Sequence, residues 1–217
     1  MTDESAPEPP AGPPVRVSLR AELGAAHDPD FTMVLPPGWE RREVTEDEKH
    51  RMTQAMRSRL MGVHRPDLYA RMRVLMDDAF AQLAAVSAVA VFLPSGESAL
   101  ALPASLTAGI LRPQPGRGLD ELVREAVARD GATPLLGDKR FMRAERESSR
   151  SLDGESATVT TVVYLTPIPG SGRRRALQLT LVIVRPPDAP PDDPPMVQMR
   201  MLFDLCVSTL TWMPAGS

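Results

Sequence analysis

The chain has 217 residues, of which 42% are hydrophobic and 24% charged, as in a folded globular protein. A formal net charge of −3 argues against a nucleic-acid binder, because contacts to phosphates need an excess of basic side chains. The single cysteine, Cys206, excludes a framework of internal disulfides, and no apolar run approaches the ~18 residues of a membrane-spanning helix. The first residues also lack the apolar core of a signal peptide. We therefore expect a cytoplasmic protein that does not insert into a membrane, and its oligomeric state is left open.

The N-terminal residues 1–14 hold five prolines among acidic and small side chains. Such a segment buries too little apolar surface to offset the entropy lost on ordering, so the composition predicts a disordered acidic tail. A short strand is expected at Val15–Leu19, where apolar and polar residues alternate. No interdomain linker follows, so we expect a single α+β domain over residues 15–213 and a short C-terminal tail over residues 214–217.

A pair of helices is predicted in the first half of the chain. Thr45 and Glu48 have the spacing of a capping box at the start of a helix over residues 45–62. A second helix with one apolar face follows Pro66 and ends near residue 84. Because the link between the two helices is short, they are expected to form an antiparallel pair.

The centre of the domain is predicted by two apolar β runs, Ala157–Thr166 and Ala176–Arg185. The connector Pro167–Gly172 is rich in proline and glycine and predicts a turn, so the two strands should be antiparallel neighbours. Lys139–Glu147 alternates, carries many charges and is expected at an edge of the sheet, and Ser148–Glu155 is expected to be a polar turn. Further strands are expected at Phe31–Leu35, Ala88–Leu93, Ala99–Pro103 and Ser105–Leu111.

Two more helices are predicted in the second half of the chain. One runs over residues 118–129, and Gly131 is placed to end it in a left-handed cap. The proline-rich stretch Pro186–Pro195 can form neither strand nor helix, and it leads to a last helix whose apolar face includes Phe203. Trp212 is expected at or beyond the end of that helix.

Short motifs give no catalytic, cofactor or metal site. The histidines His27, His50 and His64 lack the spacing of metal ligands, so we expect them to face solvent. The stretch 96–98, Gly-Glu-Ser, lacks the second glycine and the following helix of a nucleophile elbow. The stretch 116–118, Gly-Arg-Gly, lacks the third glycine and the preceding strand of a dinucleotide fingerprint. No cofactor is therefore expected.

Two groups of residues are candidates for binding a partner. Methionines lie at helical spacing in the early helix pair, where they either pack the core or line an adaptable apolar groove. The arginine triplet in the turn between the central strands is either a solvated tip or a docking point for an acidic partner. The candidate residues are Met52, Met56, Met72, Met76, Arg173, Arg174 and Arg175.

The order of elements carries a resemblance to known proteins. A strand that ends in Leu35-Pro36-Pro37-Gly38-Trp39 precedes the helix pair, and the chain closes on the helical segment Leu202–Trp212 after the two long strands. Residues 28–213 thereby resemble an uncharacterised actinobacterial family, some members of which are encoded near type VII secretion genes. The layout is also similar to the Mog/PsbP-like α/β/α sandwich, whose relatives act mainly as binding or assembly factors. The added helix pair over residues 45–84 departs from the simplest form of that fold.

Pattern and resemblance together predict an α+β fold, in which an antiparallel β-sheet is flanked by helices and an N-terminal helix pair is added. The expected function is that of a non-enzymatic binding or accessory protein, associated through the resemblance with a type VII secretion system. A protein partner would dock on a sheet edge or in a groove beside the helix pair. The alternative is an enzyme whose carboxylates and arginines come together only in three dimensions.

Overall fold

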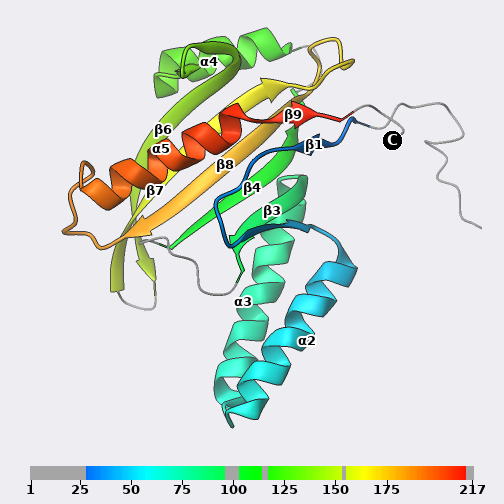
Figure 1. The fold of residues 1–217 in the computed structure, drawn as a ribbon, viewed down its shortest axis with the longest axis vertical. Helices are drawn as coiled ribbons and strands as arrows, with labels where there is room; N and C mark the ends of the chain where they lie inside the picture. Colours follow the sequence, from blue (N-terminus) through cyan, green and yellow to red (C-terminus); the bar gives the residue numbers. More distant parts are fainter. Residues whose placement is uncertain (1–27, 96–102, 114–116, 153–154, 214–217) are drawn as a thin grey trace, which may run out of the picture.

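The computed structural model describes residues 28–95, 103–113, 117–152 and 155–213 (Figure 1). Its centre is a seven-stranded sheet in the order β2-β3-β4-β8-β7-β6-β5, in which every neighbouring pair is antiparallel. From one edge to the other, the strands are β2 (Trp39–Glu43), β3 (Ala88–Pro94), β4 (Ala104–Leu111), β8 (Ala176–Arg185), β7 (Glu155–Pro167), β6 (Asp138–Leu152) and β5 (Thr133–Leu135). This is the expected α+β arrangement, with the two apolar β runs at the centre of the sheet.

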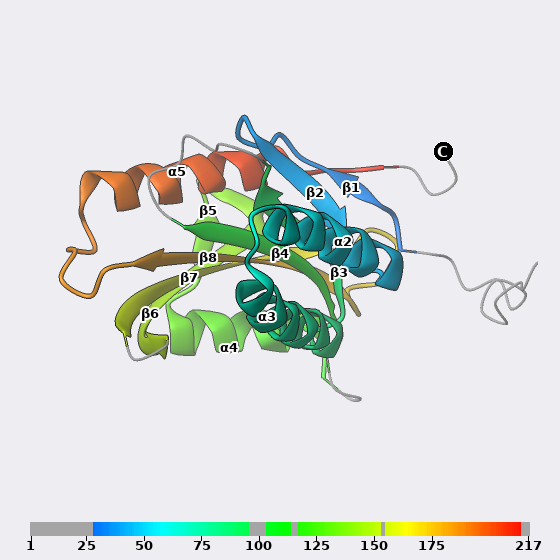
Figure 2. The same cartoon turned by 90° about the horizontal axis from the view of Figure 1, so that it is seen from below.

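The two faces of the sheet are covered differently (Figure 2). Helix α5 (Pro194–Ser208) lies on one face, together with a two-stranded sheet formed by β1 (Phe31–Thr32) and β9 (Thr211–Trp212). Helix α4 (Leu119–Asp130) lies on the opposite face, and α3 (Pro66–Ala85) reaches the same side. The sheet is therefore the middle layer of the molecule.

The hydrophobic core lies between the sheet and α5. Strands β7 and β8 alternate between buried and half-buried residues, and their buried residues face α5. The Phe203 ring of α5 packs edge-on against Trp39 at 4.9 Å between ring centroids, and Phe31 meets Trp212 in the same manner at 6.1 Å. Burial of these aromatic rings fixes α5 and the β1–β9 pair on this face.

The early helices form an antiparallel hairpin that projects from the sheet (Figure 1). The first is α2 (Glu46–Gly62), and its N-terminus is capped by Thr45, whose hydroxyl accepts a hydrogen bond of 3.2 Å from the backbone N–H of Glu48. Pro66 is the first residue of α3, a position at which its missing N–H loses no hydrogen bond within the helix. Only Glu48 in α2 and Phe80 in α3 are buried, so most of the hairpin surface is exposed.

Several expected boundaries are wrong. The first strand is only Phe31–Thr32, whereas Trp39–Glu43 forms an edge strand that its charged sequence did not suggest. The residues expected to form a polar turn at Ser148–Glu155 continue β6 as far as Leu152, because they pair with β7. Strand β6 forms an edge only beyond Arg143, since β5 pairs with its first residues.

The partner of β3 is β4, over Ala104–Leu111. Pro103 lies before that strand, and the rest of the expected return strand, residues 99–102, lies outside the described residues. The same holds for the expected tails, the strand at Val15–Leu19 and His27.

Candidate functional site

The face of the sheet opposite α5 is only partly covered. In a row across the strands, Thr107 of β4 pairs with Thr180 of β8, which pairs with Val163 of β7, which in turn pairs with Ala144 of β6. All four residues are half-buried. Central strands of a sheet that is covered on both faces would be apolar and buried throughout. This face is therefore an open floor of mixed threonine and aliphatic side chains.

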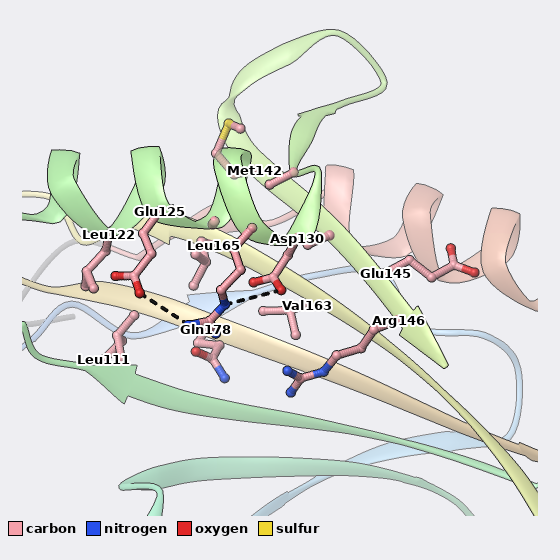
Figure 3. A pocket seen from close by; sticks show the side chains of 14 residues that line it. Leu111, Leu122, Glu125, Asp130, Met142, Glu145, Arg146, Val163, Leu165 and Gln178 are labelled. Atoms are coloured by element: carbon pink, nitrogen blue, oxygen red, sulfur yellow. Dashed lines mark hydrogen bonds and ion pairs between the residues drawn. The ribbon is translucent and has the colours of Figure 1, made fainter. Parts of the chain in front are cut away.

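Two adjoining cavities lie on this floor, with volumes of about 290 Å³ and about 380 Å³. Both are lined by Leu111 and Gln178, so the two cavities adjoin, and we call the pair the open-face groove. Leu122 and Ala126 of α4 form one wall (Figure 3), and Val86 at the end of α3 forms the other. The groove is thus bounded by the two helices on this side of the sheet.

A glycine in β4 allows the end of α3 to approach the sheet. A Cβ atom added to Gly109 would lie 3.0 Å from the carbonyl oxygen of Val86, closer than such contacts normally are. The backbone N–H of the next residue, Ile110, donates a hydrogen bond of 3.1 Å to the carbonyl oxygen of Ser87. Gly109 therefore lets the backbone after α3 bond directly to β4, which places Val86 at the groove.

Charged side chains line the rim of the groove at α4. Glu125 accepts hydrogen bonds from Arg117 at 3.0 Å and from Arg129 at 3.3 Å, and Arg129 also lies 3.8 Å from Asp130. These side chains are between one third and two thirds exposed. Ion pairs this exposed are screened by water and are weak, so they hold the rim loosely.

Two further arginines at the groove have no ion pair within the described part of the chain. Arg112 lines the cavity on the β4 side, and Arg146 of β6 lines the other cavity. Figure 3 shows Arg146 on the pocket side of β6, whereas Glu145 points away from it. The groove therefore offers two guanidinium groups to a ligand.

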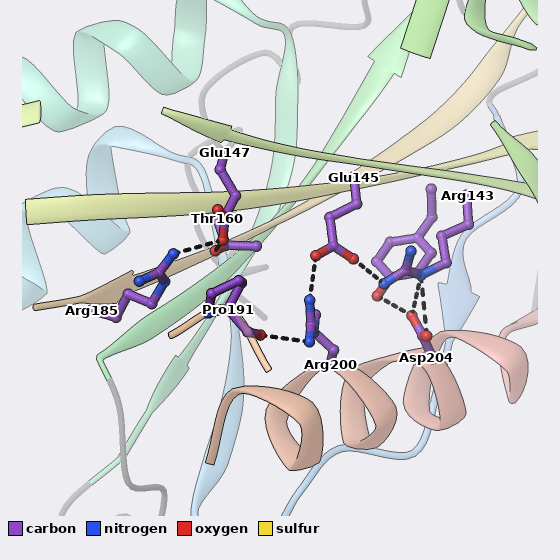
Figure 4. Close-up of polar contacts among 9 residues, drawn as sticks. Arg143, Glu145, Glu147, Thr160, Arg185, Pro191, Arg200 and Asp204 are labelled. Carbon is purple, nitrogen blue, oxygen red and sulfur yellow. Dashed lines mark hydrogen bonds and ion pairs between the residues drawn. The ribbon is translucent and has the colours of Figure 1, made fainter. Parts of the chain in front are cut away.

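The opposite face carries a network of half-buried charges between β6 and α5 (Figure 4). Asp204 of α5 accepts hydrogen bonds from Arg143 at 2.9 Å and from the Tyr164 hydroxyl at 2.7 Å. Glu145 accepts from Arg143 at 2.7 Å and from Arg200 at 2.6 Å. Each acid is thus shared by two donors, which locks α5 onto the sheet.

The pKa shifts in this network favour the protonation states that its hydrogen bonds require. Burial raises the pKa of Tyr164 far above its usual range, and the neighbouring Asp204 adds to this effect, so the phenol stays protonated and donates. Burial would also raise the pKa of Glu145, but the hydrogen bonds from Arg200 and Arg143 outweigh it and lower that pKa. Because each charge has its partner in place, we interpret this cluster as a structural latch.

A second ionic contact fixes the proline-rich connector before α5. Arg185 is buried and donates to Glu147 at 3.0 Å, and Thr160 donates to the same carboxylate at 3.0 Å. Arg185 also donates to the carbonyl oxygen of Ala189, while Arg200 donates to that of Pro191 at 2.8 Å. The connector is therefore attached to the sheet and to α5 by arginine side chains.

The candidate methionines lie in the helix hairpin. Met52, Met56 and Met76 are half-buried, and Met72 is 38% exposed. On the same face of α2 as Met52 and Met56, the Lys49 amine lies 2.8 Å from a carboxylate oxygen of Asp77 in α3. Met52 also lines a cavity of about 300 Å³ beside the helix pair, together with Leu93 and Pro94 of β3. The role of the methionines in binding a partner stays a prediction.

The candidate arginines lie in the turn between β7 and β8. Arg173 pairs with Asp120 of α4, and Arg175 lies 2.5 Å from a carboxylate oxygen of Asp28. Arg174 is exposed and has no ion pair with a described residue. Two of the three guanidinium groups therefore have partners within the chain, and docking of an acidic partner here stays a prediction.

The other reactive side chains form no site. His50 and His64 are exposed, and burial raises the pKa of the Cys206 thiol, so it stays protonated. Within the described residues, no group of three or more histidine, cysteine or acidic side chains could hold a metal ion. No helix in this part of the chain is long and apolar enough to span a bilayer.

The open-face groove was not among the sequence-based candidates. One signal for it is the alternation in β8, where the polar residues Gln178 and Thr180 lie between the leucines of the buried face. Polar residues at every second position predict that one face of a strand is not fully buried. The walls of the groove could not be predicted, because α3 and α4 meet the sheet through contacts distant in sequence.

Comparisons with known proteins show a similarity of architecture. No protein-family model matches the sequence, and no curated protein matches it. The structure is similar to that of LpqN, described as involved in cell envelope biogenesis of Mycobacterium tuberculosis, with 12% identity, a TM-score of 0.43, and 88% of this chain and 86% of that chain covered. It is also similar to a point mutant of the protein Mog1, with 14% identity, a TM-score of 0.43, and 83% and 89% covered. At these values the similarity concerns the arrangement of elements and carries no inference about activity.

Proposed function

We propose that the protein is a non-enzymatic binding protein that holds an extended segment of a protein partner in the open-face groove. The observation that carries this proposal is the incomplete cover of one sheet face, where two adjoining cavities lie between α3 and α4. The opposite face is closed by α5 and latched by half-buried ion pairs. A concave hollow that combines apolar side chains with well-placed polar groups is typical of a binding site.

The groove is a better docking site than the sheet edges. At one edge, Arg41 and Arg42 of β2 are held in ion pairs with Asp30 and Glu48. At the other edge, β5 contains Pro134, which lacks the N–H needed to pair with an added strand. The second half of β6 is also an edge, and it carries the charged residues Arg146, Glu147 and Arg150. Charged residues and prolines on edge strands oppose pairing with another chain. Docking in the open-face groove therefore replaces, as our proposal, the sheet edge and the groove beside the helix pair that were expected from the sequence.

The dimensions and chemistry of the groove suit an extended acidic peptide. From β4 to β6 it crosses three strand spacings, which is about 14 Å and the length of roughly four extended residues. Leu165 and Val163 on the floor offer apolar contacts to alternate side chains. Arg112 and Arg146, on the β4 and β6 sides, can each bond a carboxylate of the ligand.

The alternative of an enzyme has less support from the geometry. Carboxylates and guanidinium groups do meet at the groove, but Glu125 and Asp130 are paired with arginines at its exposed rim. General acid–base chemistry needs a group that can accept or release a proton beside a bound substrate. The rim arrangement supports recognition of a ligand instead. The resemblance to proteins encoded near type VII secretion genes makes components of that apparatus the partners to test first.

A selection from a random peptide library on the purified protein tests this proposal. We expect enriched peptides that combine aliphatic residues with aspartate or glutamate. The substitution Val163→Trp fills the floor and should abolish their binding. Val159→Trp is the matched control, because Val159 is also half-buried on the same face of β7 but lies four residues earlier in the strand, about 13 Å away. Peptides that bind the Val163→Trp and Val159→Trp proteins equally well would contradict the proposal.

A further inference from the structure

The tip of the α2–α3 hairpin differs in charge from the rest of the chain. We define the tip as residues 57–73, which contain five arginines and one aspartate, a net charge of +4 with His64 neutral. Since the whole chain carries −3, the remaining 200 residues carry −7. The positive charge of the protein is thus concentrated on one protruding element.

Most of the arginines at the tip are available to a partner. Arg65 pairs with Asp67 at 3.1 Å. Within the described residues, the other four have no ion pair, and all are exposed: Arg57, Arg59, Arg71 and Arg73. They lie within about three turns of the loop that joins the helices, so the tip presents them together.

Aliphatic side chains lie among these arginines and are also exposed. Met61 is 46% exposed and Val63 64% exposed at the loop, while Val74 and Leu75 at the border of the tip are 57% and 58% exposed. Since about half or more of each side chain is exposed, these four residues contribute little to the packing between the two helices. Exposed aliphatic residues grouped on a protruding element indicate an interaction surface.

We propose that the hairpin tip docks the protein on the surface of an anionic lipid bilayer, without crossing it. Arginines pair with lipid phosphates, while aliphatic side chains such as Val63 enter the headgroup region. The tip is convex (Figure 1), which suits a deformable lipid surface better than a preformed protein pocket. A nucleic acid would also attract the arginines, but its phosphate backbone gains nothing from Val63 or Leu75. This proposal does not depend on the groove.

The magnitude of the attraction makes the proposal measurable. Each arginine near an anionic bilayer strengthens partitioning by roughly fivefold. Removal of two tip arginines should therefore weaken binding by about 25-fold. Salt should weaken it as well, because it screens exposed charges.

Co-sedimentation of the full chain with vesicles tests the proposal. One set contains phosphatidylcholine alone, and the other contains phosphatidylcholine mixed with phosphatidylglycerol. We expect binding only to the mixed vesicles, and we expect it to fall about 25-fold in the double variant Arg57→Gln/Arg59→Gln. Val63→Ser should weaken it by several-fold at unchanged charge. The matched control Arg124→Gln/Arg174→Gln removes two exposed arginines elsewhere on the chain that also lack ion pairs within the described residues, and should bind as the original protein does.

Several outcomes would overturn the proposal. They are absence of binding to the mixed vesicles, equal binding to both vesicle types, and equal loss in the tip and control variants. Sedimentation equilibrium without lipid gives a further outcome. If Val63→Ser halves the mass of an oligomer, the tip joins two copies of this chain and does not dock on lipid. Far-ultraviolet circular dichroism confirms that each variant is folded.

Discussion

The two faces of the sheet are built from the same strands and serve different purposes. In β8, Leu179, Leu181 and Ile183 are fully buried against the α5 side, whereas the intervening Thr180 and Val182 are half-exposed. The difference arises from what covers each face, since α5 spans one and α4 covers only part of the other. The closed face holds the hydrophobic core, which leaves the open face available to a ligand.

The largest expected loss of stability comes from removing a core side chain on the closed face. Phe203→Ala removes a fully buried ring that packs against Trp39 and should lower the free energy of unfolding by about 3–5 kcal/mol. Val163→Ala on the open face should cost about 1 kcal/mol or less, because that side chain is half-exposed. Urea unfolding followed by circular dichroism measures both. Equal losses would show that the two faces contribute alike.

The second contrast concerns ion pairs on the two faces. Asp204→Ala leaves the buried Tyr164 hydroxyl and the Arg143 guanidinium without their shared acceptor, and should destabilise the fold by about 2–4 kcal/mol. Glu125→Ala breaks exposed pairs at the groove rim and should cost at most about 1 kcal/mol. The thermal midpoints of the two variants give the comparison. A larger loss for Glu125→Ala would mean that the rim, not the latch, holds the fold.

Low pH should destabilise the contact between α5 and the sheet, because it protonates Glu145. Hydrogen bonds from Arg200 and Arg143 lower the pKa of Glu145 in the folded protein below its ordinary value of 4.5, although burial opposes them. A carboxylate with a lowered pKa stabilises the fold above its unfolded pKa, and this contribution is lost as the pH falls through the folded pKa. The urea midpoint should therefore decline below about pH 4.5, and Glu145→Gln should make that decline shallower. An unchanged slope in Glu145→Gln would refute the role of this latch.

The last prediction concerns the close contact between Gly109 and the backbone at the end of α3, where a modest loss of stability is expected. Gly109→Ala places a methyl group 3.0 Å from the Val86 carbonyl oxygen and should cost about 1–2 kcal/mol. Gly62→Ala is the matched control, because nothing lies within 4 Å of its added Cβ and it sits in the last turn of α2. It should be neutral or slightly stabilising. Thermal unfolding of the two variants tests whether the contact at Gly109 matters.

Much of the fold could be predicted where local chemistry and tertiary structure agree. The side-chain cap by Thr45, Gly131 as the left-handed cap of α4, and the central pair β7–β8 are all confirmed, whereas the Glu48 carboxylate pairs with Arg42 and Arg51 and does not complete the capping box. In each case a short stretch of sequence carries a specific signal. At the end of α4 the signal is the glycine itself, because Gly131 adopts a φ of 64° without strain. These signals do not depend on contacts distant along the chain.

The errors have the opposite origin. Strand β2 consists of Trp39 and four charged residues, which are poor strand formers, and it is a strand because it pairs with β3. The second half of β6 is extended for the same reason, through pairing with β7. The groove escaped prediction because its walls depend on the approach of Val86 to Gly109, which no local pattern encodes.

Methyl NMR during titration with a library-selected acidic peptide tests the central claim, that the open face binds a ligand while the closed face supports it. The account predicts that methyl signals of Val163 and Val182, on the open face, shift in proportion to bound peptide. Signals of Leu179 and Leu181, which alternate with Val182 on the closed face of β8, should stay in place. Shifts confined to the leucines or to the helix hairpin would contradict it.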